Sequence, residues 1–296
     1  MTNNTLTNQM ENTVEAKMLT GERAMFFAHD SQIQDCTFAD GESPLKHASD
    51  IDVAGTNFRW KYPMWYAENV KVADSVIFKD GRAGIWYTKD ITVRDTVIEA
   101  PKNFRRCTKV ALENVDFTDA SETLWHCSSV ALNNVRAKGD YFLMDSSDLK
   151  ISHLTLVGNY PFDGVKNAEI RSSRLISKDA FWNAENITIY DSYISGEYFG
   201  WNSRNITLVN CTVESHQGFC YIDNLVMKNC KILNTDLAFE YSRVDIESTT
   251  PIQSVKNPLG GTIRAPEIEE IIMEEERVDT SRTTIITGAK HKEGEK

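Results

Sequence analysis

From Ile33 to Ile246 the chain repeats a short apolar pattern every 19 to 21 residues. The pattern is clearest in Asn186-Ile-Thr-Ile-Tyr-Asp191 and Asn205-Ile-Thr-Leu-Val-Asn210, which lie one period apart. A fixed short period means that one supersecondary unit is stacked on copies of itself. Each unit has one apolar anchor: Ile33, Val53, Val72, Val93, Leu112, Leu132, Ile151, Ile170, Ile189, Leu208, Met227 and Ile246.

Each unit combines a strand pattern with a turn signal. Apolar residues alternate around the anchor, as at Ile187 and Ile189, which is the period of a β-strand. Two residues past the anchor most units carry Asn, Asp or Gly, which accept the left-handed conformation and turn the chain. These turn formers are Asp35, Gly55, Asp74, Asp95, Asn114, Asn134, Asp191, Asn210 and Asn229.

The unit length selects the fold. Helical solenoids need about 33 or more residues per repeat, whereas three short strands and three turns in about 20 residues form one coil of a parallel β-helix. Strict six-residue phasing, which a left-handed helix needs, is absent. Parallel crossovers are right-handed in general. We therefore expect an all-β fold, a right-handed single-stranded parallel β-helix of about 12 coils with 19–21 residues each.

Three regions are expected along the chain. Residues 1–24 are polar and form a lead-in or N-terminal cap, and residues 25–248 form the β-helix. Residues 249–296 interrupt the repeat with Pro and Gly and carry an acidic, plausibly helical run from Glu267 to Asp279 before a charged tail. Both flanking regions are expected to cap the open ends of the stack.

Composition excludes several classes of function. A formal net charge of −11 argues against binding nucleic acid or an anionic membrane. The chain has no apolar run of about 20 residues, and its opening lacks the pattern of a secretory signal, so we expect a cytoplasmic protein. Cys211 and Cys230 fall on successive units within bonding range, but a reducing compartment favours buried thiols. Phosphate loops, zinc motifs and a nucleophile elbow are absent, so neither a cofactor nor a metal is expected.

One polar column recurs eight to ten residues after the anchors. It reads Glu42, Lys61, Arg82, Lys102, Glu122, Asp140, Asn159, Asp179, Glu197, His216 and Asp236. It is either a solvent-facing row, as solenoid exteriors require, or a groove with three cations between two carboxylates. Neighbouring carboxylates such as Asp179 and Glu197 would raise the pKa of one of them, as acid/base pairs require.

An aromatic column recurs a few residues later and comprises Trp65, Trp86, Trp125, Trp182, Trp201, Tyr221 and Phe239. Recurrence along the whole chain favours a core ladder over a ligand platform. The segment from Phe58 to Tyr66 is too rich in aromatic residues and cations for one core position, so part of it must lie at the surface. The candidate binding residues are Arg59, Trp60, Lys61, Tyr62, Trp65, Trp86, Arg105, Trp125 and His126.

Three segments carry a family resemblance: Gly41-Glu-Ser-Pro-Leu-Lys46, Phe58-Arg-Trp-Lys-Tyr-Pro-Met-Trp65 and Ser254-Val-Lys-Asn-Pro258. They resemble an uncharacterised bacterial family of single-stranded β-helix proteins, a domain of unknown function, and more distantly the pectin-lyase-like superfamily. The superfamily resemblance implies a groove along one sheet, with Asp pairs for hydrolysis or an Arg/Lys base with Ca²⁺ for elimination. This sequence has neither the Asp clusters nor a calcium carboxylate set.

Two hypotheses about function follow. In the first, the protein binds a small anionic or sugar-like ligand, or a partner, at the Trp/Arg/Lys patch. In the second, it is a carbohydrate-active lyase or hydrolase on an acidic or phosphorylated sugar. Glu42 or Glu122 would be the acid/base, Lys61, Arg82 and Lys102 would neutralise charge, and Trp60 and Trp65 would stack on the sugar ring. A purely structural or assembly role is the remaining alternative. Whether the protein is an enzyme stays open at this point, as does its oligomeric state.

Overall fold

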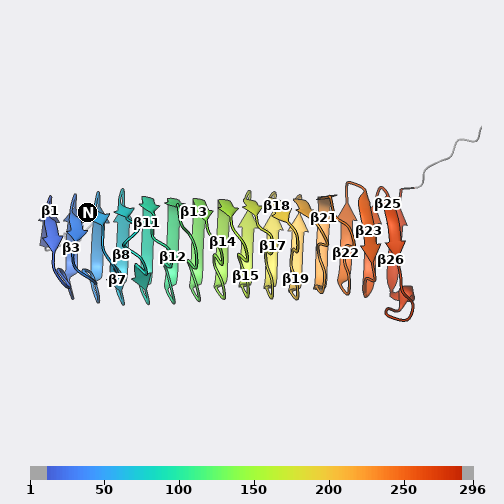
Figure 1. Ribbon diagram of the computed structural model, residues 1–296, viewed down its shortest axis with the longest axis horizontal. Helices are drawn as coiled ribbons and strands as arrows, with labels where there is room; N and C mark the ends of the chain where they lie inside the picture. The colour runs from blue at the N-terminus through green and yellow to red at the C-terminus, as the bar shows by residue number, and fades with distance from the viewer. Residues whose placement is uncertain (1–11, 289–296) are drawn as a thin grey trace, which may run out of the picture.

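The computed structural model describes residues 12–288, which form a long rod of stacked strands (Figure 1). One strand of every coil pairs in parallel with its equivalents in the coils before and after it. Fifteen strands make a rod of roughly 65 Å at about 4.8 Å per step. They are β1 (Asn12–Glu15), β3 (His29–Gln34), β5 (Ser49–Ala54), β8 (Glu68–Ala73), β11 (Lys89–Ile98), β12 (Thr108–Phe117), β13 (Ser128–Lys138), β14 (Ser147–Val157), β15 (Lys166–Arg171), β17 (Glu185–Tyr190), β19 (Arg204–Val209), β21 (Asp223–Leu233), β22 (Arg243–Ser248), β24 (Gly260–Ala265) and β26 (Thr283–Thr287).

A second series of strands follows a bend in each coil. In β11, β12, β13, β14 and β21 the bend is absent, and one long strand serves both series. The separate second strands are β2 (Met18–Thr20), β4 (Thr37–Ala39), β6 (Asn57–Phe58), β9 (Val76–Ile77), β16 (Arg174–Ile176), β18 (Tyr193–Gly196) and β20 (Thr212–Ser215). Smaller elements are the pair β7 (Met64–Trp65) and β10 (Ile85–Trp86), the pair β23 (Ile252–Lys256) and β25 (Ile268–Ile272), and a 3₁₀ turn at Thr280–Arg282.

The expected register is confirmed at every anchor. Ile33 pairs with Val53, Val53 with Val72, and the column continues through each assigned anchor to Met227 opposite Ile246. The all-β parallel β-helix is therefore confirmed as the fold class.

The stack is longer than expected, with about fifteen coils instead of twelve. Strand β1 pairs with β3, so stacking begins before residue 25 within the described residues, and β24 and β26 continue it after residue 248. The expected helix from Glu267 to Asp279 is wrong. Its first part is strand β25, because pairing with β23 outweighs the local helix propensity of an acidic run. Residues 1–11 of the expected lead-in lie outside the described residues.

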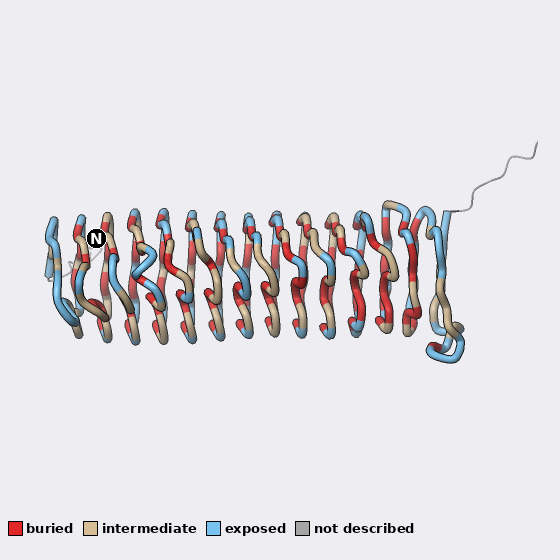
Figure 2. Tube along the Cα trace, viewed as in Figure 1, coloured by how far each residue is buried: buried red, intermediate tan, exposed pale blue. Residues whose placement is uncertain are grey.

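The interior is a continuous apolar column (Figure 2). Its largest buried side chains are phenylalanines that stack from coil to coil, such as Phe162 on Phe181 with ring centroids 4.5 Å apart. All six cysteines are buried free thiols, as expected. Over the described residues, no helix is long and apolar enough to cross a membrane.

Asn and Asp side chains bond to each other along the corners of the coils. Asn186, Asn205 and Asn224 each donate to the equivalent amide oxygen one coil earlier, at 2.9 to 3.0 Å. Their backbones have positive φ, which Asn tolerates better than most residues. Asn186 and Asn205, which each begin an Asn-Ile-Thr sequence, are thus corner residues of a ladder.

Phe181 tests the interior stack, because its side chain is fully buried between Phe162 and Phe199. We expect Phe181→Ala to lower the free energy of unfolding by about 3–5 kcal/mol through lost contacts and a residual cavity. Guanidinium unfolding followed by circular dichroism measures this loss. Val157→Ala is the control, because the Val157 side chain is 45% exposed. It should lower the free energy of unfolding by much less than Phe181→Ala does. Equal losses in the two variants would contradict the assigned interior.

Candidate functional site

The polar column divides into two neighbouring columns at its basic end. Tyr62 N donates to Arg82 O, and Ala83 N donates to Pro101 O at 3.3 Å. This register places Lys102 beside Ala83 and not beside Arg82. The prediction that Lys61, Arg82 and Lys102 form a single row is therefore wrong. Lys102 is offset from that row by one residue, because the coil from Arg82 to Lys102 differs in length from the coil before it. The two residues nevertheless lie on adjoining coils of the same side of the rod.

The carboxylates proposed as acid/base groups are both held in ion pairs. Glu42 accepts from Lys61 Nζ at 3.0 Å. Glu122 lies 3.3 Å from Lys102 Nζ and also contacts the Arg105 guanidinium. Three of the cations expected to meet a ligand are thus already neutralised by neighbouring coils.

The tryptophans near this network form a surface stack, which corrects the expectation of a core ladder. The rings of Trp65 and Trp86 are parallel to within 5° and 5.0 Å apart. Their indole N–H groups donate to Ala83 O at 2.6 Å and to Lys102 O at 2.9 Å. The core positions are taken by the residues that precede them, Met64 and Ile85, so the indoles lie outside at half-buried positions.

The same stack continues through a cation. The Arg105 guanidinium lies 5.2 Å from the Trp86 ring and 4.4 Å from the Trp125 ring. Since successive members cover each other's faces, a ligand meets ring edges along most of this stack. Trp182 and Trp201 are likewise half-buried and Tyr221 is exposed, whereas Phe239 alone of the expected aromatic column is fully buried.

A group of uncompensated charge lies beside this stack, where the coil that contains β8 departs from the course of its neighbours (Figure 2). Gly81 N donates to Phe78 O at 2.7 Å, which closes a tight turn that carries Lys79 and Arg82. Among the described residues, Arg59, Lys79 and Arg82 form no ion pair. Together with Trp60, Lys61 and Lys102 they form a surface that we call the cationic patch.

The cationic patch contrasts with the charge of the whole chain. Residues 57–106 contain ten Lys or Arg against six Asp or Glu, a net charge of +4, although the chain carries −11. Trp60 is 37% exposed, and Lys61 Nζ lies 5.3 Å from its ring centroid. The Arg59 guanidinium lies over the Phe78 ring at 5.3 Å. Of the predicted site, Arg59, Trp60 and Lys61 therefore lie together at a surface whose local charge is positive.

Two further predicted residues, Tyr62 and His126, contact groups outside the cationic patch. The Tyr62 ring packs against Trp65 at 4.7 Å. His126 is exposed, and its Nδ1 lies 3.8 Å from the Asp145 carboxylate. Lys79 was not among the expected residues. The signal for it is the 21-residue spacing from Val72 to Val93, which leaves room for an outward turn.

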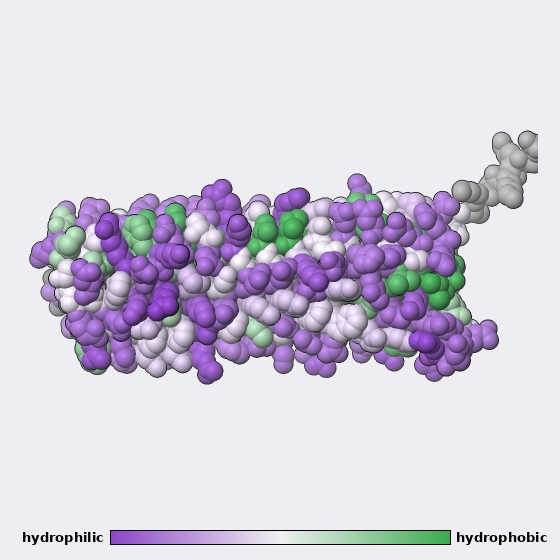
Figure 3. All heavy atoms as spheres, in the orientation of Figure 1, coloured by the Kyte–Doolittle hydropathy of each residue, from purple (hydrophilic) through white to green (hydrophobic). Residues whose placement is uncertain are grey.

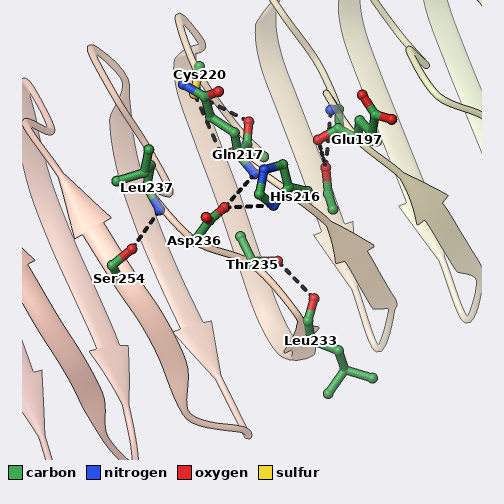
Figure 4. A network of polar contacts seen from close by, with 12 residues as sticks. Glu197, His216, Gln217, Cys220, Leu233, Thr235, Asp236, Leu237 and Ser254 are labelled. Carbon is green, nitrogen blue, oxygen red and sulfur yellow. Dashed lines mark hydrogen bonds and ion pairs between the residues drawn. The ribbon is translucent and has the colours of Figure 1, made fainter.

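The distal end of the polar column is also paired coil to coil. Figure 4 shows the His216 ring directed at Asp236, with Nδ1 3.0 Å from the carboxylate, and Gln217 N donating to the same group at 3.1 Å. Lys178 and Glu197 are 3.5 Å apart. In the view of Figure 3 the surface is largely hydrophilic with small hydrophobic groups, as expected for a solvated face of a solenoid. Within residues 12–288 no group of His, Cys, Asp and Glu is arranged to hold a metal ion.

Asp179 differs from the rest of the column because it is buried. Its side chain is 1% exposed and its Oδ2 has no hydrogen-bond partner. Burial raises the pKa of this carboxyl, Lys178 and Tyr160 lower the pKa, and Glu197 raises it further. The sequence predicted a raised pKa for one carboxyl of the Asp179–Glu197 pair, and the pKa of Asp179 is raised. Burial is the largest cause of this rise, and the charge of Glu197 is a smaller one.

Comparisons with known proteins agree with the resemblance noted in the sequence. A family profile described as "Protein of unknown function (DUF3737)" matches residues 12–286. No curated protein matches the chain.

Three solved structures align along most of the chain. The A-module of the Azotobacter vinelandii mannuronan C-5 epimerase AlgE4 is 9% identical, covers 93% of this chain and 87% of its own, and has a TM-score of 0.29. A mutant of the periplasmic alginate epimerase AlgG is 8% identical, with 93% and 74% covered and a TM-score of 0.29. PfbA, a surface adhesin of Streptococcus pneumoniae, is 8% identical, with 92% and 83% covered and a TM-score of 0.27. Likenesses at these scores carry no argument about a site.

Asp179 gives a pH-dependent prediction. Its folded-state pKa is raised, so ionisation above the ordinary Asp pKa destabilises the folded chain, and this penalty is complete above the folded-state pKa. We expect Asp179→Asn to raise the melting temperature at pH 7 by a few degrees. The gain should shrink as the pH falls from the folded-state pKa toward the ordinary Asp pKa, and should be absent below the ordinary Asp pKa. Thermal scans of both proteins from pH 3 to 8 measure the difference. A gain that is constant across this range would refute the burial of a charged carboxylate as its cause.

Proposed function

The chain belongs to the DUF3737 family, and we propose that it is a binding protein for a small acidic sugar, held at the cationic patch. One observation supports this most directly: Arg82 carries a charge that no described carboxylate neutralises, and its coil pairs through Tyr62 with the segment that carries the exposed Trp60. A guanidinium binds a carboxylate through two parallel hydrogen bonds, and an indole face packs against the apolar face of a sugar ring.

The pairing of the carboxylates favours binding over catalysis. An acid/base residue must exchange a proton with the ligand, whereas Glu42 and Glu122 are engaged by Lys61, Lys102 and Arg105. The hollows of about 470 and 690 Å³ on this molecule are lined by other residues. The cationic patch therefore offers an outward-facing charged surface in place of an enclosed reaction site.

We also propose that the protein works in the cytoplasm. Cys107 and Cys127 lie on neighbouring coils, as do Cys211 and Cys230, and all four are free buried thiols. Thiols at such close positions stay reduced most readily in a reducing compartment. Detection of a Cys211–Cys230 disulfide in protein freshly isolated from its own cells would argue against this location.

Arg82 provides the test of the binding proposal. We expect galacturonate, but not the neutral sugar galactose, to raise the melting temperature of the intact chain, and the shift to fall with added salt. In Arg82→Ala the affinity should fall about tenfold or more, since a hydrogen bond to a charged group is worth about 1.5–3 kcal/mol.

Lys228→Ala is the matched control, because Lys228 is an exposed cation far from the cationic patch along the rod. Its affinity for galacturonate should equal that of the unaltered chain. Equal affinity in Arg82→Ala, or an equal shift with galactose, would exclude recognition of an acid at this surface.

A further inference from the structure

A corner ladder of Asn and Asp side chains is interrupted at two successive coils. Asn134 Nδ2 donates to Asn114 Oδ1 at 2.8 Å, and Asn210 Nδ2 donates to Asp191 Oδ1 at 3.1 Å. Between these two stretches the equivalent positions hold His153 and Ser172. From Asp95 to Asn229 these are the two units whose turn residue is neither Asn nor Asp.

A hollow of about 690 Å³ lies at the interruption. It follows the bend where the continuous strand β14 gives way to the separate strands β15 and β16, and this change opens the outer corner of the rod. Two rows of side chains line it. One row contains His153, Ser172 and Asp191, and the other contains Thr155, Arg174 and Tyr193, paired across successive coils.

Three polar side chains in this hollow are not engaged in polar contacts with other side chains. Within residues 12–288 the His153 ring, the Ser172 hydroxyl and the Arg174 guanidinium have no side-chain hydrogen bond or ion pair. The guanidinium instead lies over the Tyr193 ring at 4.5 Å, and this ring is fixed by its hydroxyl, which donates to Glu214 at 2.8 Å. The guanidinium is thus held in place with its donors unused.

We propose that this hollow binds the phosphate monoester of a sugar. A guanidinium, an imidazole and hydroxyl donors converge from two neighbouring coils, which suits a compact oxyanion with several acceptor oxygens. Asp191 and Asn210 continue the same wall, and their side-chain oxygens and amide suit the hydroxyl groups of the attached sugar.

This site is separate from the cationic patch. The two share no residue and lie on different coils, so the failure of one proposal leaves the other standing. The two sites also differ in the proposed ligand: the hollow would bind a phosphate dianion, and the cationic patch would bind the carboxylate of a sugar acid.

The experiment is calorimetric titration of the full chain with glucose 6-phosphate, inorganic phosphate and glucose. We expect the tightest binding for glucose 6-phosphate, weaker binding for inorganic phosphate, and none for glucose. Arg174→Gln should weaken the binding of glucose 6-phosphate about tenfold or more. Lys17→Ala, at an exposed cation near the N-terminal end of the rod, should leave it unchanged.

His153→Asn separates binding from folding. This change supplies the amide that the ladder lacks, so the unliganded melting temperature should stay equal or rise, while the affinity for glucose 6-phosphate falls. The proposal would be overturned if neither phosphate probe bound. It would also be overturned if Arg174→Gln and His153→Asn bound glucose 6-phosphate with the affinity of the unaltered chain. Inorganic phosphate binding as tightly as glucose 6-phosphate would overturn the role given to Asp191 and Asn210.

Discussion

Parallel hydrogen bonding between equivalent positions of successive coils is the interaction on which the whole structure depends. It aligns equivalent residues of successive coils in columns along the rod, and neighbouring residues of a column are about 4.8 Å apart. At that spacing Phe stacks on Phe in the interior, Trp on Trp at the surface, and Asn donates to Asn at the corners. The chain adopts positive φ at many non-glycine corners, and these ladders stabilise the turns that would otherwise be costly.

The same vertical contacts limit what the surface can bind. Glu122 is neutralised by Lys102 and Arg105, and Arg105 lies between two indoles. A residue whose charge and hydrogen-bonding groups already contact its neighbours in the stack has few groups free to bind a ligand. Binding capacity is therefore expected where a column is interrupted. One such place is the tight turn that carries Arg82, and the other is the corner where His153 and Ser172 replace the Asn/Asp ladder.

Asp179 shows the cost of an imperfect column. A carboxyl at a position that holds Tyr160 one coil earlier is buried without a partner for one oxygen. Its raised pKa follows from that burial, and Glu197 adds a smaller contribution. His216, nearer the end of the polar column, avoids this cost because it is exposed and pairs with Asp236.

The sequence by itself determined the fold class, the family and the register, because a 19–21-residue period with alternating apolar residues admits one way of stacking. The twelve anchors from Ile33 to Ile246 pair as their spacing requires. Only the tertiary structure decided which columns face inward and which charges remain free. A side chain one position away points to the opposite face of a strand, so Ile85 fills the core while Trp86 lies outside. Likewise a one-residue difference in coil length separated Lys102 from Arg82, and only the three-dimensional pairing showed that Glu42 and Glu122 are already neutralised.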